Sequence, residues 1–142
     1  MATRYAIVVG EFYGELAERL VTSARRVFEE AGADAVDVFG VPGAFELPLA
    51  AQMAAGTERY AGIACVGAVI RGETSHYDHV CNEAARGIQD VALRTGVPCG
   101  FGLVTVENME QAMARSGGGK RDQGAHAAEA VLALVRVRAE LL

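Results

Sequence analysis

The chain has 142 residues, of which 51% are hydrophobic, and its formal net charge is -5. This length fits one domain, residues 1–142, and the negative charge disfavours nucleic acid as the main partner. No run reaches the roughly 18 apolar residues of a membrane span, and we expect no signal peptide, because the first residues lead directly into an apolar run. The three cysteines form no CxxC motif, which predicts neither a disulfide framework nor a zinc site. Together these features favour a cytoplasmic protein.

Short apolar runs alternate with amphipathic stretches along the chain. Runs rich in β-branched residues predict strands, and apolar side chains that recur three and four residues apart predict helices. In chain order, the predicted elements are a strand at 5–9, a helix at 15–31, a strand at 36–41, a helix at 44–55, a strand at 62–69, a helix at 79–95, a strand at 99–106, and helices at 108–116 and 124–142. This alternation predicts an α/β fold, with a parallel sheet covered by helices on both faces and right-handed crossovers.

Particular residues mark the ends of the predicted helices. Gly32 suits the position just after the first helix, and Pro48 fits the first turn of the second helix better than its interior. Asn108 suits the N-cap of the short fourth helix, with Gln111 three residues further on. Residues 117–119, all glycine, separate the last two helices.

The most informative stretch runs from Gly67 to His79, between the third strand and the third helix. Open parallel sheets bind ligands at the carboxyl ends of their strands, and the N–H groups at a helix start favour an anion. Thr74 and Ser75 add hydroxyl donors, and an unperturbed His76 suits proton transfer near neutral pH. The stretch therefore predicts an anion-binding, acid–base site. The alternative is an ordinary turn with Thr and Ser as caps.

Two other strand ends carry aromatic and acidic residues. Phe12 and Tyr13 follow the first strand, and residues 43–46, which end in Phe45 and Glu46, follow the second. Because the carboxyl ends of parallel strands meet at one edge, we expect a cleft there with an aromatic face, a carboxylate, an anion cradle and a histidine. The alternative is that each segment only connects two elements.

Three features of the sequence have more than one functional interpretation. Residues 67–74 have the spacing of a nucleotide-binding P-loop, but Glu73 stands where the lysine would be, so we reject that interpretation. His76 and His79 could share a metal ion, although no third ligand lies nearby in the sequence. Arg115, at the end of a predicted helix, either complements the helix dipole or clamps a phosphate.

Five segments together resemble the lumazine synthase family, which catalyses the penultimate step of riboflavin biosynthesis. They are residues 41–48 (VPGAFELP), 69–76 (VIRGETSH), 81–85 (CNEAA), 101–105 (FGLVT) and 107–112 (ENMEQA). They occur in the family's order over nearly the whole chain. The resemblance implies a flavodoxin-like three-layer α/β/α sandwich with a four-stranded parallel sheet.

The resemblance also implies a reaction. 5-Amino-6-(D-ribitylamino)uracil condenses with 3,4-dihydroxy-2-butanone 4-phosphate to give 6,7-dimethyl-8-ribityllumazine, phosphate and water, and no cofactor or metal is expected. Position by position, His76 would move protons, Phe12 would stack on the pyrimidine ring, and Thr74, Ser75 and Arg115 would hold the phosphate. The other implied substrate-binding residues are Ala44, Phe45 and Glu46 beside the ribityl chain, Ala68, Ile70 and Glu73, and Phe101 from a neighbouring subunit.

A site completed by a neighbour implies a homo-oligomer. The family resemblance implies a pentamer, and a kink at 116–124 without an insertion favours twelve pentamers packed into an icosahedral shell. The short stretch before the first strand argues against the shell. Riboflavin synthase is a candidate partner.

Two segments depart from the family's pattern, residues 11–13, where the family often has Arg-Phe-Asn, and residues 122–124, where it usually has Asn-Lys-Gly. Tyr13 replaces an asparagine, and Gln123 replaces a lysine unless Lys120 or Arg121 substitutes for it.

Two other functions stay open beside this one. An archaeal-type riboflavin synthase has a similar fold and uses the lumazine product, although the motif at 72–76 argues against it. A flavin-binding, lumazine-binding or shell-forming protein without catalysis is the alternative from another class.

Overall fold

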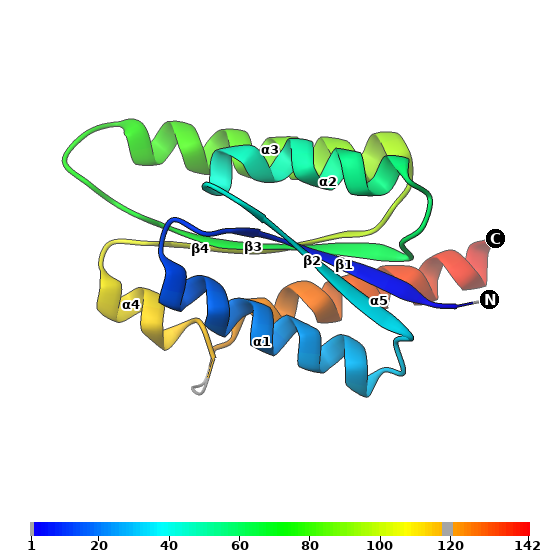
Figure 1. The fold of residues 1–142 in the computed structure, drawn as a ribbon. Helices are drawn as coiled ribbons and strands as arrows, with labels where there is room; N and C mark the ends of the chain where they lie inside the picture. The colour runs from blue at the N-terminus through cyan, green and yellow to red at the C-terminus, as the bar shows by residue number, and fades with distance from the viewer. Residues whose placement is uncertain (1, 118–120) are drawn as a thin grey trace.

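The computed structural model describes residues 2–117 and 121–142 and has alternating strands and helices (Figure 1). In chain order, the elements are β1 (Arg4–Gly10), α1 (Gly14–Glu30), β2 (Ala35–Val41), the 3₁₀ turn η1 (Ala44–Glu46), α2 (Leu47–Gly56), β3 (Gly62–Ile70), α3 (His76–Thr95), β4 (Cys99–Val106), α4 (Met109–Ala114) and α5 (Gln123–Leu141). No helix in the described ranges has the length and apolar character to span a bilayer.

The four strands pair in the order β2-β1-β3-β4, and every pairing is parallel. Helices α2 and α3 cover one face of the sheet, while α1 and α5 cover the other, with α4 beside them near the end of β4 (Figure 1). The predicted α/β sandwich is therefore confirmed. The strand order is that of a flavodoxin-like fold with four strands.

Each face of the sheet has its own core. Under α1 and α5, Leu16, Leu20 and Phe28 pack against β1 and β3, and the Phe28 ring stacks on Tyr5 with centroids 4.3 Å apart. Under α2 and α3, Leu47, Ile63 and Leu103 pack with six buried alanines, as many alanines as in the other core. The three cysteines carry free thiols.

The predicted boundaries of the second helix were wrong at its start. Residues 44–46 form a 3₁₀ turn, and α2 begins at Leu47 with Pro48 in its first turn. The physical reason is that proline has no N–H, so residue 48 cannot donate the i→i−4 bond to Ala44 that a continuous α-helix requires.

The predicted start of the third helix was also wrong. Helix α3 begins at His76, three residues before the predicted start. The first turn of α3 is exposed apart from the half-buried Tyr77, so it lacks the apolar periodicity on which the prediction depended. The correction matters because it places His76 at the helix start.

The predicted roles of Gly32 and Asn108 at helix ends were correct, whereas α4 ends at Ala114, two residues before its predicted end. Gly32 follows α1 with φ +90°, a left-handed conformation that favours glycine. The Asn108 side chain accepts a hydrogen bond from the Gln111 N–H at 2.9 Å, which makes it the N-cap of α4.

The kink between α4 and α5 falls partly outside the described residues. Ser116 and Asp122 form an isolated antiparallel bridge at its two ends. The glycines at 118 and 119, and the proposed substitute Lys120, lie outside the described ranges.

Candidate active site

Two strand ends meet closely at the carboxyl edge of the sheet. A Cβ added at Gly10, the last residue of β1, would lie 3.0 Å from the backbone carbon of Gly43, which follows β2. Such a contact is tighter than most Cβ contacts in proteins, so a side chain at Gly10 would require the two segments to shift slightly apart. Glycine therefore lets the Phe12 turn and the η1 segment approach one another.

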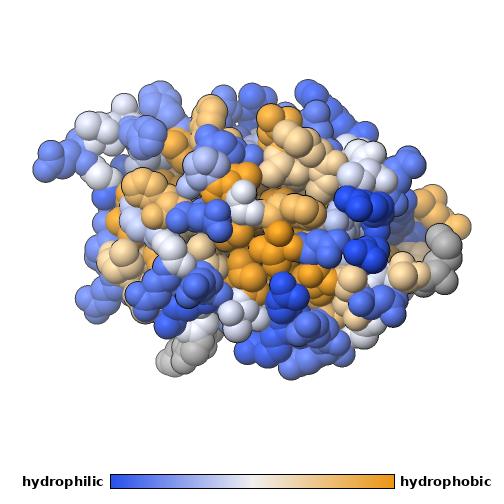
Figure 2. Space-filling model, in the orientation of Figure 1, coloured by the Kyte–Doolittle hydropathy of each residue, from blue (hydrophilic) through white to orange (hydrophobic). Residues whose placement is uncertain are grey.

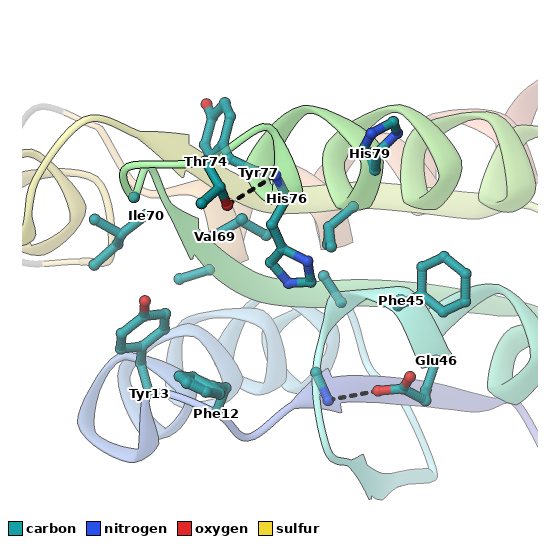
Figure 3. Close-up of a pocket in the computed structure, with 15 residues that line it drawn as sticks. Phe12, Tyr13, Phe45, Glu46, Val69, Ile70, Thr74, His76, Tyr77 and His79 are labelled. Carbon is teal, nitrogen blue, oxygen red and sulfur yellow. Dashed lines mark hydrogen bonds between the residues drawn. The ribbon is translucent and has the colours of Figure 1, made fainter.

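A cleft of about 560 Å³ opens at this edge. Eight of the predicted site residues line it: Phe12, Ala44, Phe45, Glu46, Ala68, Ile70, Thr74 and His76. They come from the ends of β1, β2 and β3, so the three strand ends converge on one cleft as the sheet topology predicted. Figure 3 shows Phe12 and Tyr13 on one side of the cleft, with Thr74 and His76 on the other.

The start of α3 supplies the anion-binding features. Ser75 is its N-cap and, over the described chain, makes no side-chain hydrogen bond to the first turn. The starts of α1 and α2 likewise have no side-chain cap, whereas Asn108 and Asp122 cap α4 and α5 through their side chains. At α3, Thr74 Oγ1 accepts from the His76 N–H at 3.3 Å. The N–H groups that follow have no capping side chain and can bind an anion.

The imidazole of His76 lies beside this helix start. The residue is exposed, and Figure 3 shows its ring pointing into the cleft. An imidazole in reach of a bound phosphate ester can exchange protons with the reacting groups.

Aromatic and acidic side chains form the opposite part of the cleft. The Phe12 ring, 72% exposed, meets the Tyr13 ring edge to face with centroids 4.8 Å apart. An exposed ring of this kind offers a stacking surface for a planar ligand. Glu46 Oε1 accepts a hydrogen bond from the Gly43 N–H at 3.0 Å, which orients the carboxylate.

Four predicted residues do not line the cleft within the described chain. Glu73 and Ser75 lie in the turn before α3 and are exposed. Phe101 lies on β4, paired with Cys65, away from the cleft-lining end of β3. Arg115 is the C-cap residue of α4, and its Nη1 donates to the Gln111 carbonyl at 3.0 Å, the contact expected of a cation at a helix end.

Seven further residues line the cleft, of which Tyr13 and Gly43 belong to the strand-end segments expected there and the others were assigned no place in the site: Tyr13, Gly43, Val69, Gly72, Tyr77, His79 and Val80. A helix beginning at His76 would have identified two of them, because His79 and Val80 lie three and four residues further along the same face. Among the described residues, no three His, Cys, Asp or Glu side chains gather as metal ligands would.

The fold and the cleft define a class of protein. An open cleft at the carboxyl edge of a parallel sheet, with an uncapped helix start and an exposed imidazole, is typical of α/β enzymes that act on anionic small molecules.

Comparison with known proteins narrows the class. The sequence model of the family described as 6,7-dimethyl-8-ribityllumazine synthase matches residues 2–139. A 6,7-dimethyl-8-ribityllumazine synthase of Nitratidesulfovibrio vulgaris strain DP4 is 44% identical over 140 residues, covering 97% of this chain and 90% of that protein. One from Ruthia magnifica subsp. Calyptogena magnifica is 40% identical over 139 residues, covering 93% and 83%. The chain belongs to the 6,7-dimethyl-8-ribityllumazine synthase family, whose members are transferases of riboflavin biosynthesis.

Proposed function

We propose that this chain condenses 5-amino-6-(D-ribitylamino)uracil with 3,4-dihydroxy-2-butanone 4-phosphate to form 6,7-dimethyl-8-ribityllumazine, with release of phosphate and water. The observation that carries the proposal is the cleft itself, in which His76 lies beside the uncapped start of α3 and opposite the exposed Phe12 ring. The two substrates call for these features, since one is a planar pyrimidine and the other a phosphate ester.

The phosphate ester binds at the start of α3. Thr74 and Ser75 contribute hydroxyl groups, and the free N–H groups of the first turn point at the anion. Glu73 lies in the same turn, so its backbone belongs to this cradle although its side chain does not line the cleft. The carbonyl carbon of the butanone is then held beside the His76 ring.

The pyrimidine binds against the opposite wall. Its ring stacks on Phe12, and its ribityl hydroxyls donate to Glu46 next to Ala44 and Phe45. Ala68 and Ile70, at the end of β3, form the apolar floor. This pose brings the 5-amino group to the butanone carbonyl, and holding two reactants together supplies much of the rate acceleration.

His76 moves protons in three steps. The 5-amino nitrogen attacks the butanone carbonyl, and a C=N bond forms as water leaves. The phosphate group then departs with its C–O bonding electrons after a proton is lost from the neighbouring carbon. This elimination leaves an enol on the former hydroxyl-bearing carbon, and the enol tautomerises to a new carbonyl. Finally, the ribityl-bearing nitrogen attacks that carbonyl, and a second water leaves as the ring closes. One exposed imidazole beside the reacting carbons can accept and return these protons.

Arg115 completes the phosphate site in this proposal. Its guanidinium bonds a carbonyl of its own helix and is only half-buried, so a side-chain rotation can release it to a phosphate. A charge-assisted contact to phosphate is stronger than one to a neutral carbonyl, which favours the rotation.

We propose that the site is completed by a neighbouring subunit in a pentamer. Phe101 is 44% exposed on the edge strand β4. It lies three residues before Val104, which is paired with Ala68, and this separation is about 10 Å along a strand. Phe101 is therefore better placed to reach a neighbour's cleft than its own.

Exposed apolar side chains supply surfaces for such an assembly. Phe45, Leu49 and Met53, four residues apart along η1 and α2, are each more than half exposed. Figure 2 shows a second apolar area over the edge strand β2, where Val38 and Phe39 are exposed. Contiguous apolar surface of this kind marks protein–protein contacts.

Our proposal extends to a shell of twelve pentamers, to riboflavin synthase as a partner and to a cytoplasmic location.

A single assay tests the activity. The two substrates are mixed with the protein, and the lumazine absorbance band is followed with and without enzyme. A protein-dependent rise supports the proposal. No rise from the two substrates, with turnover of added lumazine to riboflavin, would indicate a riboflavin synthase, and lumazine binding without turnover would indicate a binding protein.

Sedimentation velocity at neutral pH tests the assembly. A pentamer or a sixty-subunit particle supports a shared site. A single species at pentamer mass that does not change with concentration would exclude the shell and leave the pentamer. A monomer that is fully active would contradict the role of Phe101.

A further inference from the structure

Arg71 connects three segments at the rim of the cleft. Its N–H donates to the Val106 carbonyl at 2.9 Å, just past the end of the β3–β4 ladder. Its guanidinium lies 2.9 Å from a carboxylate oxygen of Glu107, which precedes α4, and 3.5 Å from one of Asp78 in the first turn of α3. The side chain is 40% exposed and does not line the cleft within the described residues.

The same guanidinium also lies over an aromatic ring of α3. Its central carbon is 4.2 Å from the centroid of the Tyr77 ring, within the range of a cation–π contact. Tyr77 is half-buried, and its hydroxyl lies near the side chains of Thr105 and Cys81. Figure 3 shows the Tyr77 and His76 rings on opposite sides of the start of α3. Holding the Tyr77 ring therefore fixes the first turn of α3, from which the His76 side chain extends into the cleft.

These contacts join the two ends of a short exposed loop. Residues 72–75 run between Arg71 and α3, and the hydrogen bond from the His76 N–H to Thr74 Oγ1 lies within this segment. The Arg71 side chain reaches Tyr77 and Asp78, six and seven residues further on, and so fixes the span of the loop. A loop fixed before binding loses less conformational freedom when it closes around a phosphate.

We infer that Arg71 is a positioning residue that, with Glu107, Tyr77 and Asp78, holds the β3–α3 loop and the first turn of α3 in the geometry that binds phosphate and directs His76. This inference rests on the proposed function, because it assigns the loop to the phosphate ester. It goes further in giving a role to Arg71, Asp78 and Glu107, which do not line the cleft in the described chain, and to the Tyr77 ring that Arg71 covers.

The charges around Arg71 separate positioning from direct binding. Burial by itself lowers the pKa of the Arg71 guanidinium. Glu107, Asp78 and Tyr77 together raise this pKa by more than burial lowers it, so the net shift is upward. The charge is thus shared with two carboxylates before any phosphate arrives. Because the Arg71 guanidinium is already paired with Glu107 and Asp78, it attracts a phosphate less strongly than an unpaired cation would. This favours a positioning role for Arg71 over direct phosphate binding.

The link to Glu107 also connects the loop to α4. Glu107 receives a second anchor through its own N–H, which donates to Gln111 Oε1 at 2.8 Å. The short helix that follows ends at Arg115. The Arg71–Glu107 pair therefore fixes the distance between the two predicted phosphate-binding elements.

The test compares Arg71→Met, Arg71→Lys and Glu107→Gln with the full-length protein. Inorganic phosphate is titrated into each by calorimetry, and kcat and KM are measured for both substrates. Arg71→Met should weaken phosphate binding by roughly three- to tenfold, the sum of an exposed ion pair and a cation–π contact. It should lower kcat as well and leave the KM for the pyrimidine unchanged. Arg71→Lys should retain only part of the phosphate affinity and kcat that Arg71→Met loses, because lysine lacks the planar group that can stack on Tyr77 and pair with carboxylates at the same time.

Glu107→Gln separates positioning from direct binding, because the two roles predict opposite changes in phosphate affinity. Removal of a negative charge near a phosphate site should strengthen phosphate binding if electrostatic attraction by a freed Arg71 dominates. The positioning role predicts the opposite, a two- to fivefold weakening at about the strength of an exposed pair. Tighter phosphate binding in Glu107→Gln, or unchanged phosphate binding in Arg71→Met, would overturn the inference.

Arg86→Met is the matched control. Arg86 also forms two exposed ion pairs, with Glu83 and Asp90, but within α3. Its loss should change neither phosphate affinity nor kcat, and melting temperatures identify any variant that fails to fold. If Arg71→Met does not fold, Glu107→Gln decides alone. Absence of lumazine formation by the wild type would overturn the proposed function, while the phosphate titrations would still decide the role of Arg71. A wild type that binds no phosphate would overturn both.

Discussion

The two edges of the sheet differ in whether their polar groups are paired within the protein. At the amino edge, polar groups bind one another: Asp37 accepts from the Tyr60 hydroxyl at 2.7 Å and from Arg4 at 3.1 Å. At the carboxyl edge, Thr74 and His76 are exposed beside a helix start without a side-chain cap in the described structure. Groups paired within the protein stabilise the fold, whereas groups with free donors can bind a ligand.

The phenylalanines show the same contrast. All five lie in the described chain, and only Phe28, stacked on Tyr5 at the amino edge, is fully buried. Phe12 and Phe45 at the cleft are 72% and 59% exposed. Burial stabilises a protein in proportion to the apolar area removed from water, so the exposed rings stabilise the monomer little. Their free faces can instead stack on a ligand or a neighbouring subunit.

The largest expected effect is that of Phe28→Ala. Removal of a fully buried Phe leaves a cavity and should lower the free energy of unfolding by about 3–5 kcal/mol. The same substitution at Phe12, which is 72% exposed and is assigned to no subunit contact, should change it by no more than about 0.5 kcal/mol, as at other exposed positions. Urea unfolding at one protein concentration measures both. Equal losses in the two variants would show that the edges do not differ as we describe.

The next effect is that of His76→Ala on turnover. General acid–base catalysis contributes about 10²–10⁴-fold, and proximity of the substrates accounts for part of the acceleration, so we expect a loss near 100-fold. The unfolding free energy should stay unchanged, because the ring is exposed. His126→Ala, at an exposed histidine on α5, is the control. Wild-type turnover in His76→Ala would remove His76 from the mechanism.

Arg115→Ala should act on one substrate. Loss of a hydrogen bond to a charged group, about 1.5–3 kcal/mol, should raise the KM for the butanone phosphate roughly 10- to 100-fold. The KM for the pyrimidine should change less. Arg94→Ala, which removes a cation from the last turn of α3, tests whether a helix-end charge alone has this effect. A larger change for the pyrimidine would place Arg115 in that substrate's site or in a subunit contact.

The smallest effect concerns acid stability at the amino edge. The Tyr60 hydroxyl, followed by Arg4, lowers the pKa of Asp37. A lowered folded-state pKa adds stability above the unfolded value of about 3.9, and this stability is lost as pH falls through the folded value. Tyr60→Phe should therefore lower the melting temperature slightly at pH 7, and the difference should narrow below about pH 4. A difference that is independent of pH would show that Asp37 is not responsible.

The sequence predicted the elements that depend on local pattern. The four strands and most helix ends follow from β-branched runs, from Gly32 and from the cap at Asn108, because these signals act within a few residues. The starts of α2 and α3 were misplaced, since Pro48 forces a 3₁₀ turn there and the exposed first turn of α3 carries no apolar period.

The sequence by itself determined that three chemically distinct strand ends lie at one edge, because a βαβ alternation allows little else. Only the tertiary structure decided which side chains face the cleft. It places Tyr77 and His79 at the cleft, leaves Phe101 on the far strand, and turns Arg71 toward Glu107, 36 residues away. These outcomes depend on helix rotation and on contacts between segments distant in the chain, and the periodicity of a single segment carries no information about either.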